Sequence, residues 1–241
     1  LGDVYKRQEQ KGILYLYTPD GLSPDKHKVE FKARNYAFDL SNKSYIYIKG
    51  LNFFAAAINT DYRTSYCVID SCNMKYVDHF TQCNGYSTNK GRANKLLGKH
   101  NTLINSTIKY SAGDGIWVAG SYHKISNCVI SDVDYMGITG GAINLGGWWM
   151  GPCINTTVSY NTLYNSGRFL IMCYNTKKSK ILYNEMYNGD LLVYDGGAIY
   201  SWKSDGDGTE IAYNIIHDMK TYLGMGIYLD NGDQNYLVHH N

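Results

Sequence analysis

The chain has little proline and no long apolar run. It holds 3 prolines in 241 residues, and no apolar stretch reaches the length of about 18 residues that marks a membrane-spanning helix. Its charge is nearly balanced, because 23 Lys and Arg residues oppose 21 Asp and Glu residues for a net charge of +2. Proteins that bind nucleic acid or anionic membranes usually carry a basic excess. We therefore expect neither nucleic acid nor a membrane as a partner.

The cysteines follow no metal-binding spacing. Cys67 and Cys72 enclose four residues, which is too many for the CxxC pairs of zinc and redox sites. The remaining cysteines are Cys83, Cys128, Cys153 and Cys173. A secreted chain could pair them as disulfides. We expect instead that they are buried free thiols that pack as small apolar residues.

Tyrosine, glycine and asparagine are abundant. The sequence holds 24 Tyr and 25 Gly, and a helical period is hard to find in it. Gly and Asn accept the left-handed backbone conformation of tight turns. This composition favours many short strands joined by turns.

A six-residue pattern recurs along the chain. It consists of an aliphatic residue, two variable positions, a small or polar residue, one variable position and an apolar residue. The copies begin at Ile48, Ile69, Leu103, Ile125, Val158, Ile181, Ile211 and Val238. The fourth position is Asn from the copy at Val158 onward. Strand alternation slips once within the pattern, so we expect a left-handed residue at this fourth position and a hydrogen-bonded ladder of Asn side chains.

A glycine turn followed by a short strand accompanies the later copies. It reads GDGIWV at 113, GGAINL at 140, GRFLIM at 167, GGAIYS at 196 and GMGIYL at 224. The two elements together predict a parallel β-helix, a solenoid whose coils are buried by stacking on their neighbours. Leucine-rich repeats have a more regular period and more leucine, and a β-sandwich would need hairpin turns.

This repeat resembles the right-handed parallel β-helix, pectin-lyase-like superfamily, from about residue 45 to the end. The segments ILYLYTPDG (13–21) and YAFDLSNKSYIYIKGLNF (36–53) resemble the start of the helix in bacterial β-helix glycosidases. The resemblance implies an all-β fold, a secreted, periplasmic or cell-surface location, and a polysaccharide or oligosaccharide as partner. It leaves the oligomeric state open.

The resemblance also suggests a domain organisation. Residues 1–8 (LGDVYKRQ) resemble a translated sequencing adapter, so we expect natural sequence to begin near Glu9. Residues 9–44 would lead into the helix. Residues 45–241 would form about eight coils, incomplete at the C-terminal end, in a fragment cut at both ends.

The glycine-turn strands predict one shared outward face. If their Ile positions point into the core, alternation turns a row of aromatic and polar residues outward. That row is Trp117, Asn144, Tyr200, Trp202, Tyr228 and Asp230. Rings beside amides and carboxylates suit sugars, so these residues are candidates for substrate binding. The alternative is an aromatic ladder that only stabilises the outside of the helix.

Two carboxylates are candidates for catalysis. Asp195 and Asp230 lie one coil apart beside the glycine-turn strands, and glycoside hydrolysis needs a pair of carboxylates across the scissile bond. By resemblance, β-helix glycosidases place their acidic catalytic residues on adjacent coils in such strands. The alternative is that each aspartate only caps a turn next to glycine.

Three further residues are weaker candidates. Asp205 and Asp207 in SDGDG could bind calcium, although the spacing of an EF-hand is absent and a tight turn explains them as well. His217 could contact substrate or simply end a strand. No metal ligand set and no other cofactor is predicted.

These features favour a glycoside hydrolase that acts on a plant or algal polysaccharide. A polysaccharide lyase is the alternative enzyme, for which Arg168 or Lys203 could supply the base. A non-catalytic glycan-binding or adhesin solenoid is the third possibility, because this fold carries many functions.

Overall fold

The computed structural model describes residues 5–8, 13–16, 18–30, 32–78, 94–220 and 223–241. Contacts divide the chain into two units, residues 1–33 and 34–241. The first unit contains an antiparallel pair, β1 (Tyr5–Gln8) with β2 (Ile13–Leu16), and a short 3₁₀ helix, η1 (Pro24–Lys26). Within the described ranges, no helix is long and apolar enough to cross a membrane.

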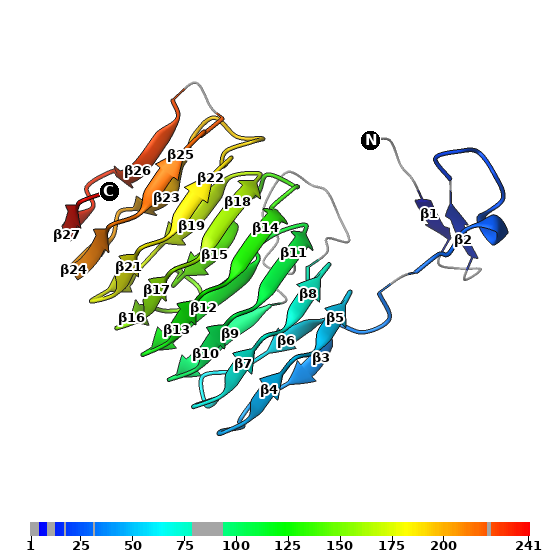
Figure 1. The fold of residues 1–241 in the computed structure, drawn as a ribbon, viewed down its shortest axis with the longest axis horizontal. Helices are drawn as coiled ribbons and strands as arrows, with labels where there is room; N and C mark the ends of the chain where they lie inside the picture. Colours follow the sequence, from blue (N-terminus) through cyan, green and yellow to red (C-terminus); the bar gives the residue numbers. More distant parts are fainter. Residues whose placement is uncertain (1–4, 9–12, 17, 31, 79–93, 221–222) are drawn as a thin grey trace. The chain divides into compact units, whose positions relative to one another are not determined.

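The second unit consists of parallel strands stacked coil upon coil (Figure 1). It begins with β3 (Tyr36–Asp39), which pairs with β6 (Ala57–Asn59). The first sheet contains β4 (Tyr47–Lys49), β7 (Val68–Asp70), β10 (Thr102–Ile104), β13 (Lys124–Ser126), β17 (Thr157–Ser159), β21 (Lys180–Leu182), β24 (Asp205–Ala212) and β27 (Gln234–His239). The second sheet contains β5 (Asn52–Phe54), β8 (Asn73–Lys75), β11 (Thr107–Ser111), β14 (Val129–Val133), β18 (Thr162–Ser166), β22 (Glu185–Tyr187) and β25 (Ile215–His217).

The third sheet carries the glycine-turn strands. It contains β9 (Lys95–Lys99), β12 (Ile116–Ser121), β15 (Gly141–Leu145), β16 (Cys153–Ile154), β19 (Phe169–Cys173), β20 (Thr176–Lys177), β23 (Gly197–Trp202) and β26 (Met225–Asp230). From β7 to β26 each coil contributes strands to all three sheets, and the chain then returns to the first sheet.

The strand register confirms the six-residue repeat. Along the first sheet every first position pairs with the first position of the next coil, from Ile48 with Ile69 to Ile211 with Val238. Along the second sheet the sixth positions pair in the same way, as in Phe53 with Met74. Most of these side chains form the buried apolar core. The repeat is thus a stack of equivalent positions, as the sequence predicted.

The predicted asparagine ladder is present and buried. The Nδ2 groups of Asn161, Asn184 and Asn214 each donate to the Oδ1 of the next asparagine, at 2.9, 3.0 and 2.8 Å, ending at Asn241. The column continues backward, since the N–H of Cys128 donates to Asn161 Oδ1 at 2.9 Å. These bonds satisfy polar groups that would otherwise be costly inside the core.

The expected place of the left-handed residue is wrong by one position. The left-handed residues are Tyr160, Tyr183 and Tyr213, each directly before the ladder asparagine, with φ of 57°, 56° and 57°. Their rings stack on one another outside the helix at 5.2 and 4.9 Å between centroids. The bend thus turns the tyrosine outward and leaves the next side chain free to point into the core.

A second polar column, which the sequence did not reveal, runs beside the first sheet. In each step a backbone N–H donates to the side chain one coil further along. Its members are Cys67, Asn101, His123, Thr156, Ser179 and Thr209. His123 is buried, and burial lowers its pKa to about 4, so its ring is neutral at pH 7. Its Nδ1 accepts from the Asn101 N–H at 3.2 Å, and its Nε2 lies 3.1 Å from the Ala119 carbonyl.

The described cysteines are free and buried, as expected. These are Cys67, Cys72, Cys128, Cys153 and Cys173. Burial raises the pKa of the Cys128 thiol to about 11 and that of Cys153 to about 12, so both are protonated at neutral pH. Cys83 lies outside the described residues.

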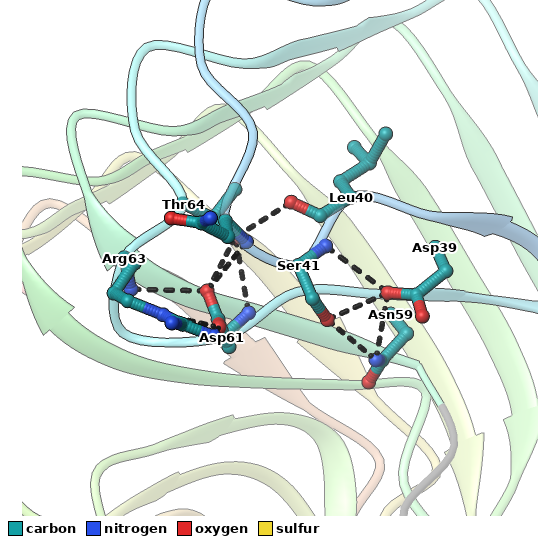
Figure 2. A network of polar contacts seen from close by, with 8 residues as sticks. Asp39, Leu40, Ser41, Asn59, Asp61, Arg63 and Thr64 are labelled. Carbon is teal, nitrogen blue, oxygen red and sulfur yellow. Dashed lines mark hydrogen bonds and ion pairs between the residues drawn. The ribbon is translucent and has the colours of Figure 1, made fainter.

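Two carboxylates organise the turns of the first coil (Figure 2). Asp39 ends β3 and accepts hydrogen bonds from Ser41 and Asn59. Asp61 follows β6, and its donors are the backbone N–H groups of Asn42 and Arg63, the Arg63 guanidinium and the Thr64 hydroxyl. Burial opposes the charge on Asp61, but these bonds outweigh it and lower the pKa to about 2.

Candidate functional site

The register of the third sheet aligns the predicted outward row. Ile116, Ile143, Ile171, Ile199 and Ile227 occupy equivalent positions on β12, β15, β19, β23 and β26. The next position along each strand is Trp117, Asn144, Met172, Tyr200 and Tyr228 in the same order. Trp202 and Asp230 form a further register pair. The glycine-turn strands therefore place these side chains on one face of one sheet.

The expectation that this whole face is exposed is wrong. Trp117 and Tyr200 are each only 4% exposed, and Asn144 is fully buried. The chain after β15 packs over Trp117, whose Nε1 donates to the Gly146 carbonyl at 2.6 Å. Trp202, Tyr228 and Asp230 are half-buried. Only the end of the row near β26 is thus open to a ligand.

A small apolar cluster covers the middle of the face. Phe169, Met172 and Tyr200 are buried against one another, and Tyr174, Trp202 and Tyr228 pack around them. The rings of Phe169 and Tyr200 are stacked with 4.3 Å between centroids. The Arg168 guanidinium lies over the ring of Phe169, 4.5 Å from its centroid.

Asp230 lies at one end of this cluster. Its Oδ2 accepts a hydrogen bond from the Tyr200 hydroxyl at 3.0 Å. Burial, a hydrogen bond to Asp230 and the charge of Asp230 raise the pKa of Tyr228. The carboxylate of Asp230 is therefore bordered by two phenol groups from β23 and β26.

Asp195 lies at the other end, just before β23. Its side chain is 63% exposed, and its Oδ2 lies 3.4 Å from Arg168 Nη2. The Nε of Arg168 also donates to the Asp195 carbonyl at 3.1 Å, and Nη1 donates to Thr139 Oγ1 at 3.3 Å. Because the Arg168 side chain is largely buried, this guanidinium fixes the position of Asp195.

A continuous chain of contacts thus joins the two carboxylates. It runs from Asp195 through Arg168, Phe169 and Tyr200 to Asp230, and we call these residues the Asp195–Asp230 cluster. The pKa of Tyr200 is raised by burial, by Tyr174, by its hydrogen bond to Asp230, and by the charges of Asp230 and Asp195. Both carboxylates therefore raise the pKa of the same hydroxyl, although no described contact joins them directly.

Asp190 is a buried carboxylic acid beside this cluster. It is 2% exposed, and neither carboxyl oxygen has a hydrogen-bond partner among the residues that the structure describes. Its carboxyl packs against Gly196, where a Cβ would lie 2.1 Å from Oδ1, and its N–H donates to the Arg168 carbonyl. Burial raises the pKa of Asp190 to about 7, with Arg168 opposing the rise and Asp195 adding to it.

The other candidates lie elsewhere or have structural partners. His217 is on the second sheet, where it stacks on Tyr187 and contacts Asp218 at 2.7 Å. Asp205 and Asp207 lie at the start of β24 and not in a tight turn; Asp205 accepts bonds from the Asp207 N–H and from Asn235, and Asp207 pairs with Lys178. In the ranges that the structure describes, no group of three or more His, Cys, Asp or Glu residues is arranged to hold a metal ion.

Sequence reasoning missed several residues of the cluster. Phe169 and Met172 belong to GRFLIM, which was recognised as a glycine-turn strand but left out of the outward row. The register of that strand was the signal that would have placed Met172. Asp190 gave no signal, since its burial depends on how the loop before Asp195 folds back.

Comparison with protein families identifies the fold. The family described as a right-handed β-helix region matches residues 78–241, more than half of the chain. The crystal structure of an alginate lyase from Paenibacillus sp. str. FPU-7 is similar with a TM-score of 0.45 and 14% identity, over 84% of this chain and 76% of that one. Similarity this low carries no information on the reaction. No curated protein matches the chain. The fold is the right-handed parallel β-helix that the repeat predicted, and the chain belongs to the right-handed β-helix family.

Proposed function

We propose that this protein is a carbohydrate-active enzyme, a glycoside hydrolase that cleaves a plant or algal polysaccharide outside the cell. The observation that carries the proposal is the Asp195–Asp230 cluster. Two carboxylates border one set of aromatic rings on a single face of the third sheet. Aromatic rings next to carboxylates are suited to hold a sugar and to act on its glycosidic bond.

The chemistry needs one carboxyl group as acid and one as base or nucleophile. Asp230 accepts a hydrogen bond from the Tyr200 hydroxyl and Asp195 pairs with Arg168, which restrains both side chains before substrate binds. Such fixed positions favour catalysis because less ordering remains for the transition state. We assign the pair together and leave the division of roles to experiment.

A polysaccharide lyase is the second candidate, favoured by Lys203. Its Nζ lies 4.5 Å from the Trp202 ring centroid, and its N–H donates to the Asp230 carbonyl at 3.1 Å. An ammonium group beside the Trp202 ring could assist proton abstraction next to a uronate carboxylate. Arg168 is less suited, because Asp195 and Thr139 already bind its guanidinium.

The test is an activity screen of the full chain against soluble xylan, β-glucan, galactan, pectin and alginate. We expect new reducing ends without the ultraviolet absorbance of an unsaturated product. Asp195→Asn and Asp230→Asn should each lower the rate at least about 100-fold. Asp207→Asn, which removes an exposed carboxylate paired with Lys178, is the matched control and should keep full activity.

Each other outcome points to a different function. Reducing ends together with ultraviolet absorbance would identify the lyase. Binding of a polysaccharide without any cleavage would identify a glycan-binding solenoid. Hydrolysis that survives both Asp→Asn changes would overturn the assignment of this pair.

A further inference from the structure

Many exposed rings of the helix are stacked on the rings of neighbouring coils. Tyr45, Tyr66, His100 and Tyr122 form one such stack, with centroids 5.1, 4.7 and 4.8 Å apart. Each of these residues has a left-handed backbone at the same corner of its coil. The exposure of such rings is thus explained by the structure of the solenoid and requires no ligand.

Trp149 is different. Its side chain is 83% exposed, and within the described part of the chain no ring stacks on it and no hydrogen bond reaches it. Tyr194 is 79% exposed and is likewise outside every ring stack of the described residues. Trp148, adjacent to Trp149, is also exposed, at 59%, and neighbouring exposed aromatic residues form the kind of apolar surface that binds a ligand.

The turn that carries Trp149 is fixed in place. Gly147 and Gly151 close it with an antiparallel bridge, and the Tyr62 hydroxyl from the first coils donates to the Met150 carbonyl. Trp148, the preceding residue, meets Trp202 edge to face at 6.1 Å between centroids. Trp149 is therefore carried by a turn whose conformation is already fixed. This lowers the entropy cost of binding a ligand there.

The loop is continuous with the Asp195–Asp230 cluster. Trp148 contacts Trp202, and Trp202 is the register partner of Asp230 on the adjacent strand. At the opposite end of the cluster, Tyr194 directly precedes Asp195. Trp149 and Tyr194 thus lie beside opposite ends of the Asp195–Asp230 cluster.

We propose that Trp148 and Trp149 form an aromatic subsite that binds a polysaccharide chain extending past Asp230, with Tyr194 holding the chain beyond Asp195. This inference rests on the proposed function and deepens it, because it makes the substrate a polymer held over several sugar rings. The flat ring of Trp149 offers stacking to the C–H face of a sugar. The Lys203 ammonium covers the Trp202 ring. The polysaccharide therefore passes along Trp148 and Trp149 instead.

Affinity electrophoresis of Asp230→Asn protein in gels that contain each of the five polysaccharides above tests this subsite without relying on cleavage. We expect one polymer to retard the protein and Trp149→Ala in the same background to weaken binding about tenfold. Tyr45→Ala is the matched control, because Tyr45 is 77% exposed but belongs to the ring stack. It should bind as tightly as its parent.

The outcomes separate the subsite from the reaction. Equal retardation of the Trp149→Ala protein and its parent, or no retardation by any of the polymers, would overturn the subsite. Retardation that depends on Trp149 in a protein whose wild-type form cleaves nothing would uphold the subsite and refute the hydrolase. In an active enzyme, Trp149→Ala should raise KM for the polymer about tenfold while hydrolysis of a short aryl glycoside stays unchanged.

Discussion

Tyr200 donates a hydrogen bond of 3.0 Å to Asp230 while its ring lies stacked on Phe169 at 4.3 Å. One side chain thus belongs both to the apolar cover of the third sheet and to the candidate catalytic pair. Through the Arg168 guanidinium above Phe169, the same stack extends to Asp195. Four successive contacts, through Arg168, Phe169 and Tyr200, therefore link the two carboxylates.

Removal of the Tyr200 hydroxyl should loosen Asp230 without disturbing the stack. We expect Tyr200→Phe to lower kcat about tenfold with little change in KM, and to cost about 1 kcal/mol of unfolding free energy. Steady-state kinetics and urea unfolding provide both values. Tyr213→Phe, in the tyrosine stack of another corner, is the control. Equal kinetics for both variants would show that Tyr200 does not position Asp230.

The buried carboxyl of Asp190 should make stability fall as pH rises. Its pKa is raised from 3.8 to about 7, so between these values the folded protein holds a proton that the unfolded chain has released. The free energy of unfolding should decrease across this range, by about 4 kcal/mol at most. Asp190→Asn should remove that loss and be more stable than the wild type at pH 8. Parallel pH profiles from urea unfolding would contradict the prediction.

His123 should act in the opposite sense. Burial lowers its pKa from 6.5 to about 4, so the unfolded chain binds a proton that the folded protein does not. The free energy of unfolding should therefore fall as pH drops from about 6.5 to about 4, by about 3 kcal/mol at most. An NMR titration of the imidazole in the folded protein measures the pKa directly. A value near 6.5 would refute the prediction.

The asparagine ladder should be a major source of stability. Asn184 accepts from Asn161 and donates to Asn214 and to the Val158 carbonyl, all in the buried core. Asn184→Ala leaves these partners unpaired, and we expect a loss of about 2–4 kcal/mol in urea unfolding. Asn73→Ala removes an exposed bond to Asn52 and should cost less than about 1 kcal/mol. Similar losses of unfolding free energy in both variants would mean that the buried ladder stabilises the protein no more than an exposed hydrogen bond does.

The repeat could be predicted from the sequence because it obeys a local rule in every coil. An apolar first and sixth position and a small or polar fourth position specify the two sheets and the ladder, and the register pairs Ile48 with Ile69 and Phe53 with Met74 accordingly. The left-handed position was misplaced because Asn is the usual residue there, whereas this chain uses Tyr160 and its equivalents.

The site was less accessible to sequence reasoning because it depends on loops. Strand alternation places Trp117 and Tyr200 outward, but whether an outward residue is exposed depends on the segments that cover the sheet. The packing of Gly146 over Trp117 is a long-range contact, and the burial of Asp190 against Gly196 depends on how the loop between them folds; neither has a sequence signature. The pairing of Arg168 with Asp195 likewise joins two coils.

The most direct test of the central claim is a crystal structure of the Asp230→Asn protein with an oligosaccharide released from the polysaccharide that the wild type degrades. The account predicts a sugar chain on the outer face of the third sheet, with a glycosidic oxygen between the side chains of residues 195 and 230. A sugar bound on the first or second sheet, with residues 195 and 230 free of contact, would contradict it.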